Sequence, residues 1–126
     1  MNTKPTTATT LDPYDLYDVR SLLSDEERMV RDAARAYCQD KLAPRVLEAF
    51  RHEKTDPAIF PEMGVLGLLG PTIPEQYGGL GLTMEEEVRV IVELSKTSPA
   101  FRSVIGTTVG IGPQGILIDG TDEQKV

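Results

Sequence analysis

Cysteine, histidine and tryptophan are scarce in this sequence of 126 residues, which has one Cys, one His and no Trp. The lone Cys38 excludes an intrachain disulfide and is typical of a reducing compartment, so we expect a cytoplasmic protein. One thiol and one imidazole cannot complete a four-ligand structural zinc site. We expect Cys38 to be inert packing and His52, within the charged run 51–54, to be a solvated surface residue.

Positive charge and long apolar runs are also in short supply. The sequence has thirteen Lys and Arg and twenty Asp and Glu, which gives a formal net charge of −7. This charge argues against nucleic acid or an anionic membrane as a partner. No apolar run approaches the roughly 20 residues that span a bilayer. Residues 1–10 lack the apolar core of a secretory signal and the arginines of a mitochondrial transit peptide. We therefore expect a protein that binds neither nucleic acid nor membrane.

Helix-start patterns recur along the chain. Capping boxes, with Ser or Thr followed three residues later by Glu, begin at Ser24 and Thr83. Apolar residues at helical spacing follow each start, and no credible strand hairpin is present. Cap-then-proline pairs stand at 56–57 and 98–99. These patterns predict an all-α fold, an orthogonal bundle of about four main helices over residues 25–42, 57–69, 84–96 and from 99 onward.

Prolines and glycines mark the expected interruptions. Pro44 should break or kink the first helix, which continues to about residue 54, and Pro113 should kink or end the last one. Pro61 is awkward inside the second helix. Residues 71–82 form a turn-rich connection.

The two ends of the sequence differ from its middle. We expect residues 1–20 to be a disordered or extended lead. Within it, four apolar or aromatic residues could pack against the body: Leu11, Tyr14, Leu16 and Tyr17. Thr121 and Gln124 form a last capping pattern, only a few residues before the sequence ends. We interpret this as a fragment of a longer protein.

The stretch 98–120 is apolar and rich in small residues. On a helical template Ser103, Gly106 and Gly110 lie on one face, and another face holds Phe101, Val104, Ile105 and Thr108. A glycine inside a helix costs about 1 kcal/mol relative to alanine. Two gains could offset this cost: close packing of a neighbouring helix, or room for a ligand.

The run 110–115 matches the GxGxxG pattern of dinucleotide sites. That pattern indicates such a site only between a strand and a helix, whereas the residues before it have helical patterns. The acidic run 85–87 is explained by the helix dipole at a solvated first turn. We find no catalytic set, metal site or cofactor site, and we expect this chain alone to bind no FAD.

Four stretches, 22–45, 62–67, 74–81 and 98–125, resemble the N-terminal α-helical domain of the acyl-CoA dehydrogenase family. The resemblance covers about residues 20–126 and implies one domain over 21–126, without the family's middle β-domain and C-terminal helical domain. The first half is most similar to glutaryl-CoA dehydrogenases, through Tyr37-Cys38-Gln39, Pro44-Arg45 and residues 68–73. The second half is more similar to broader bacterial acyl-CoA dehydrogenases.

The resemblance implies α,β-dehydrogenation of an acyl-CoA thioester, with FAD as the cofactor of the full-length protein. The catalytic carboxylate and the flavin site lie outside this chain, which would form one wall of the acyl pocket. Arg102 and Ser103 match the substrate-contacting pair of the glutaryl type, while Gly106 replaces a serine of that type. Implied partners are acyl-CoA and electron-transfer flavoprotein, in a homotetramer. The alternatives are a free-standing helical interaction module without catalysis and, with less support, a nucleotide-binding unit.

Overall fold

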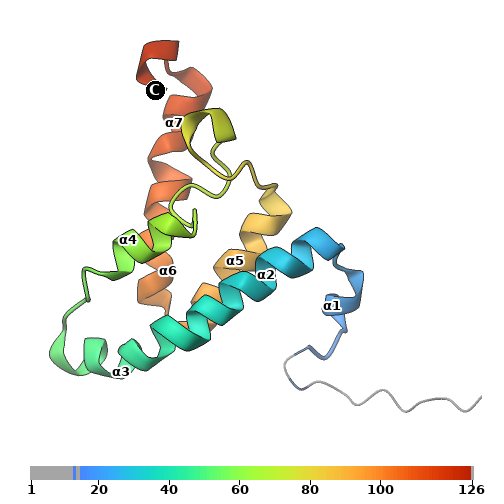
Figure 1. Ribbon diagram of the computed structural model, residues 1–126, viewed down its shortest axis with the longest axis vertical. Helices are drawn as coiled ribbons and strands as arrows, with labels where there is room; N and C mark the ends of the chain where they lie inside the picture. Colours follow the sequence, from blue (N-terminus) through green and yellow to red (C-terminus); the bar gives the residue numbers. More distant parts are fainter. Residues whose placement is uncertain (1–12, 14, 126) are drawn as a thin grey trace, which may run out of the picture.

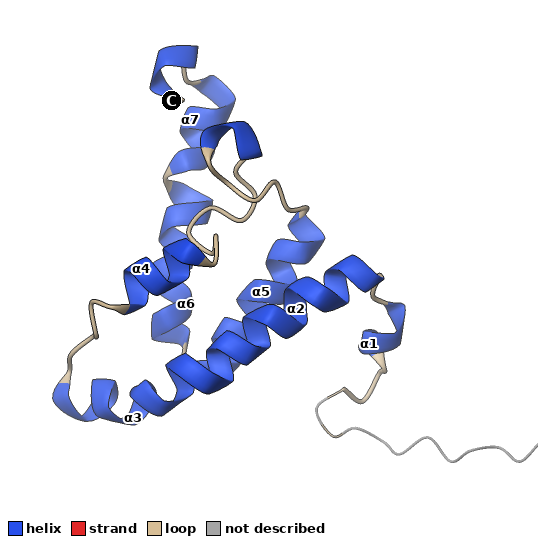
Figure 2. Cartoon of the chain, viewed as in Figure 1, coloured by secondary structure: helices blue, strands red, loops and turns tan. Residues whose placement is uncertain are grey.

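A computed structural model describes residue 13 and residues 15–125, and within this part of the chain every regular element is helical (Figures 1 and 2). The all-α prediction is confirmed. The α-helices are α1 (Val19–Leu22), α2 (Asp25–Tyr37), α3 (Ala43–His52), α4 (Ile59–Val65), α5 (Met84–Thr97), α6 (Pro99–Gly106) and α7 (Pro113–Asp119). Two π-helical segments, η1 (Cys38–Leu42) and η3 (Thr107–Ile111), and two 3-10 turns, η2 (Glu75–Tyr77) and η4 (Asp122–Gln124), complete the set. No described helix is long and apolar enough to cross a membrane.

The predicted helix starts are confirmed by their hydrogen bonds. The Ser24 amide donates to Glu27 Oε2 at 2.8 Å, and the Glu27 amide donates to Ser24 Oγ at 3.1 Å. Thr83 and Glu86 form the same reciprocal pair at 2.8 and 3.3 Å. These bonds satisfy amides that a helix N-terminus leaves without partners, and so they fix where α2 and α5 begin.

Two helices widen before a proline. α2 passes into η1 and resumes as α3 with Pro44 at its second position, and α6 passes into η3 before α7 starts at Pro113. Proline lacks an N–H and its ring clashes with the carbonyl four residues earlier, and a π turn relieves that clash. The expected breaks therefore take the form of π-helical segments in a nearly continuous helix.

The second predicted helix is shorter than expected. α4 covers only Ile59–Val65, because Asp56 Oδ1 accepts the Ala58 amide at 3.0 Å and holds the preceding residues in a turn. Pro61 is the third residue of α4, where the missing N–H would have had no helical partner. The expectation that Pro61 is awkward is therefore wrong. Gly67, at a φ of 70°, ends the segment.

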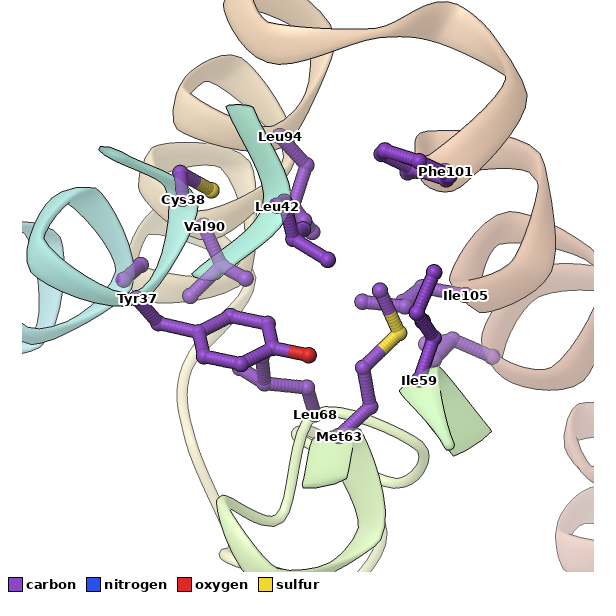
Figure 3. Close-up of a cluster of buried hydrophobic side chains, with 12 residues drawn as sticks. Tyr37, Cys38, Leu42, Ile59, Met63, Leu68, Val90, Leu94, Phe101 and Ile105 are labelled. Atoms are coloured by element: carbon purple, nitrogen blue, oxygen red, sulfur yellow. The ribbon is translucent and has the colours of Figure 1, made fainter. Parts of the chain in front are cut away.

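The core lies where α2, η1, α4, α5 and α6 meet (Figure 3). It contains Ala34, Tyr37, Cys38, Leu42, Ile59, Met63, Leu68, Val90, Leu94, Phe101, Ile105 and Val109. Burial raises the pKa of the Cys38 thiol, as expected of inert packing. His52 is exposed, with its Nε2 3.1 Å from a Glu48 carboxylate oxygen, as predicted for a surface residue.

The residues that precede α2 pack against the bundle less than expected. Leu16 is 61% exposed and Tyr17 is 90% exposed, whereas Leu23 is 5% exposed. The prediction that Leu16 and Tyr17 pack against the body is wrong, and Leu11 and Tyr14 lie outside the described residues. The difference arises because the turn before α1 directs them outward while Leu23 follows α1 into the bundle.

Candidate functional site

The run α6–η3 has one buried face and one bare face. Phe101, Ile105 and Val109 are 3%, 0% and 2% exposed, and they recur every four residues against the core. Ser103 and Gly110 are exposed. Thr108, predicted on the apolar face, is exposed instead, because a π turn takes more residues per revolution and continues the buried row to Val109.

No second helix covers the small-residue face within the described part of the chain. A Cβ atom at Gly110 would meet nothing within 4 Å. For a Cβ atom at Gly106, the three nearest atoms outside the backbone of its own helix all belong to the side chain of Arg102. Close packing of a neighbouring helix, one of the two explanations for these glycines, is therefore not found among the described residues, and an open surface remains.

The three predicted site residues lie together on this surface. Arg102 and Ser103 are exposed, and Gly106 is half-buried. The Arg102 guanidinium lies against Gly106: an ideal Cβ there would be 2.7 Å from Nη1 and 3.0 Å from Cζ. Arg102 forms no ion pair with any described residue, so its charge is available to another group.

Two threonines lie next to this surface, of which the sequence interpretation left out Thr107 and placed Thr108 on the apolar face. Thr107 Oγ1 donates to the Ser103 carbonyl at 3.1 Å, and Thr108 Oγ1 donates to the Val104 carbonyl at 3.2 Å. Such back-bonding supplies donors to carbonyls at the point where the helix widens. The signal that could have located them is Pro113, since η3 precedes it.

A cleft of about 390 Å³ lies between the 67–79 loop and α7, at the C-terminal end of the same run. Ile73 and Tyr77 line it on one side and Ile116 on the other. Gln114 Nε2 donates to Thr72 Oγ1 at 3.3 Å across the two sides. The loop beside the cleft is therefore tied to α7.

A charged network holds α4 against α2 and α3. Arg45 donates to both carboxylate oxygens of Glu62 at 2.8 and 3.0 Å, and Tyr37 donates to Glu62 at 3.2 Å. The Arg45 hydrogen bond lowers the pKa of Glu62, and burial raises that of Tyr37 to about 12. A general base works best with a pKa near the working pH, so this carboxylate is suited to structure rather than proton transfer.

Other chemistries find no support in the described residues. The GxGxxG run spans the end of η3 and the start of α7, with no strand before it, so the nucleotide-binding interpretation lacks its required context. No group of three or more His, Cys, Asp or Glu that could hold a metal occurs in the described part. The bare face with Arg102 and the adjacent cleft is the candidate site.

Comparison with known proteins gives concordant matches. The sequence model described as acyl-CoA dehydrogenase, N-terminal domain, matches residues 24–126. A probable acyl-CoA dehydrogenase of Bacillus subtilis (strain 168) is 30% identical over 113 residues, which are 89% of this chain and 19% of that protein. Mitochondrial isovaleryl-CoA dehydrogenase of Pongo abelii is 34% identical over 105 residues, which are 82% and 25% of the two chains.

A solved structure agrees with the sequence relatives. A chain from work on the electron transferring flavoprotein of Acidaminococcus fermentans and flavin-based electron bifurcation superposes with a TM-score of 0.78 and 31% identity, covering 82% of this chain and 27% of that one. The chain thus spans about a fifth to a quarter of the length of the relatives it matches. By its sequence and its fold, the chain belongs to the acyl-CoA dehydrogenase family and corresponds to the N-terminal helical domain of its members.

Proposed function

We propose that this chain forms one wall of the acyl pocket in a flavin-dependent acyl-CoA dehydrogenase. The observation that carries the proposal is the bare face of α6–η3, where glycines leave room that no described helix fills. A bound acyl chain needs such a surface, since a ligand pocket is a concave, largely preformed space with few polar groups. The comparisons give no support to a free-standing interaction module.

FAD would supply the redox chemistry by accepting a hydride from the substrate. The described residues do not fit this cofactor by themselves, because the glycine run 110–115 lies in helix rather than in a strand-to-helix turn. The flavin and the catalytic carboxylate are therefore proposed to belong to the other domains of the whole enzyme. This chain shapes and orients the acyl group.

Arg102, Ser103 and Gly106 are proposed to contact the far end of the acyl chain. A guanidinium stays charged and can bind a carboxylate through two parallel hydrogen bonds. A dicarboxylic acyl-CoA of the glutaryl type would use this group, which is the substrate class implied by the resemblance to glutaryl-CoA dehydrogenases that we propose for the first half of the sequence. Gly106 in place of serine removes one polar contact, which favours a plain acyl chain.

The remaining proposals concern the assembled enzyme. Electron-transfer flavoprotein as the redox partner, a homotetramer and a cytoplasmic location follow from the family resemblance and the reduced lone thiol. Isovaleryl- and methylsuccinyl-CoA dehydrogenases among the relatives are named for different acyl groups. The names of these relatives therefore do not identify the acyl-CoA substrate of this chain.

The test is flavin reduction in a protein that carries this chain together with the flavin-binding domains. Glutaryl-CoA, isovaleryl-CoA and straight-chain acyl-CoA are added separately under anaerobic conditions, and flavin absorbance is followed. We expect at least one thioester to bleach the flavin. If none of them does so while dithionite still reduces the flavin, the proposed function is wrong.

A further inference from the structure

A pocket of about 690 Å³ between α1, α2 and α5 is basic, although the whole protein carries a net charge of −7. Five cationic side chains from the three helices line it: Arg20, Arg31, Arg35, Arg89 and Lys96. Two carboxylates, from Asp15 and Glu93, share the lining. No residue of α6, η3 or α7 does, so the pocket is separate from the bare face described above.

Both carboxylates of this pocket are already engaged. Asp15 accepts the backbone amides of Val19 and Arg20 at 2.9 Å each, which caps the short helix α1. Glu93, whose side chain is 5% exposed, accepts a hydrogen bond from Lys96 at 2.9 Å. These two carboxylates keep their charges, but the five cations of the lining outnumber them, so the lining has an excess of positive charge.

The arginines are incompletely satisfied within the described part of the chain. The carboxylate paired with Arg89 is that of Glu27, at 3.9 Å from Nε, and this buried Nε has no hydrogen-bond acceptor. Arg20 and Arg35 form no ion pair with a described residue. Arg31 is held in place by Asp32 at 2.7 Å. The pocket thus combines one fixed guanidinium, two that form no ion pair with a described residue, and that of Arg89, which has a carboxylate at 3.9 Å but no hydrogen bond at its Nε.

We propose that this pocket binds a small molecule that carries a diphosphate group. Guanidinium groups match phosphate oxygens in geometry and bind them through paired hydrogen bonds. Arg20, Arg35 and Arg89 come from three different helices, so they approach an anion from several sides, which suits two linked phosphates better than one. The volume leaves space for an organic group beside them. This proposal is independent of the acyl-binding role.

The experiment is a calorimetric titration of the 126-residue chain with inorganic pyrophosphate, and with orthophosphate for comparison. The variants are Arg89→Gln and Arg35→Gln, the second of which removes an exposed side chain without hydrogen bonds in the described structure. The matched control is Arg51→Gln on α3, a 61% exposed arginine outside the pocket. Circular dichroism verifies that all four chains keep the same helical content.

We expect saturable pyrophosphate binding that weakens by about ten-fold or more in Arg89→Gln and Arg35→Gln and is unchanged in Arg51→Gln. Affinity should also fall as salt is raised, because the contacts are ionic. The absence of saturable binding to the unmodified chain, or equal affinity in all variants, overturns the proposal. Orthophosphate that binds as tightly as pyrophosphate would overturn the assignment of a diphosphate.

Discussion

The guanidinium of Arg102 lies directly over Gly106, which follows it by one turn of α6. A Cβ atom at residue 106 would be 2.7 Å from Nη1 of Arg102. The glycine is therefore the reason that this arginine can lie flat on the helix instead of projecting from it. In the proposed acyl pocket the pair would set both the width of the pocket and the position of its positive charge.

Removal of the Arg102 charge should impair turnover of dicarboxylic acyl-CoA substrates only. In the whole enzyme, Arg102→Ala is expected to lower kcat/KM for a dicarboxylic acyl-CoA by about ten-fold or more, about 1.4 kcal/mol per decade. The reason is the loss of a charged partner for the distal carboxylate. Steady-state kinetics with a straight-chain acyl-CoA serves as the control and should change little. Equal losses for both substrates would identify Arg102 as a structural residue.

Two glycine substitutions should change stability in opposite directions. Gly106→Ala gains helix propensity, and the nearest atoms to its Cβ are those of the flexible end of Arg102, so we expect an increase of about 0.5–1 kcal/mol in the free energy of unfolding. Gly79→Ala would place its Cβ against the backbone oxygen of Ile73, and we expect a loss of about 1–3 kcal/mol. Urea denaturation followed by circular dichroism measures both. Loss of stability in both variants to the same extent would contradict the described environment of Gly106.

The Tyr37–Glu62 contact predicts a stability change at alkaline pH. The pKa of Tyr37 is raised from 10.0 to about 12, chiefly by burial. A raised pKa stabilises the folded state below the unfolded value, so this contribution should be complete below pH 10 and lost as the pH rises towards 12. Tyr37→Phe lacks this titration, and it should also lose about 1 kcal/mol at neutral pH with its hydrogen bond.

The measurement is the free energy of unfolding of the unmodified chain and of Tyr37→Phe across this pH range. The difference between the two should shrink as the pH rises, because only the unmodified chain loses the stabilisation. Glu62 has the opposite pH dependence, because its pKa is lowered in the folded state. It stabilises the folded state at pH values above the pKa that Glu62 has in the unfolded chain, and this stabilisation is lost as the pH falls. A constant difference between the two chains across the alkaline range would show that Tyr37 is not buried as described.

The burial of Cys38 predicts slow thiol chemistry. Its side chain is 0% exposed, and burial raises its pKa, so the reactive thiolate is both rare and inaccessible. A thiol reagent such as dithionitrobenzoate should react far more slowly with the native chain than with the chain in urea. Comparable rates in the two conditions would contradict the packing of η1 in the core.

Local signals in the sequence predicted the helices well. Ser24 and Thr83 begin helices as expected, because a capping box is a contact between residues three apart and is visible in the sequence. Pro44 and Pro113 marked the right places, but their effect is a π-helical segment rather than a break, which depends on how the widened turn packs. Leu16 and Tyr17 were misassigned, because whether an apolar residue faces the core depends on tertiary structure.

The candidate site was predicted in part. Sequence spacing placed Ser103, Gly106 and Gly110 on one face, and the structure shows that face open. The position of the Arg102 guanidinium over Gly106 depends on a side-chain rotamer that spacing does not determine. The basic pocket was missed altogether, because Arg20, Arg35 and Arg89 belong to three helices that are brought together only by the fold.

The central claim is that the bare face of α6–η3 lines the acyl pocket, and Gly110→Leu in the whole enzyme tests it most directly. A Cβ atom at Gly110 would meet nothing within 4 Å in this domain, and the same is true at the position of the control, Gly115→Leu on α7. We predict that Gly110→Leu lowers kcat/KM by about ten-fold or more for long acyl chains and less for short ones, while Gly115→Leu leaves both unchanged. Identical kinetics of Gly110→Leu and the unmodified enzyme for every chain length would contradict the account.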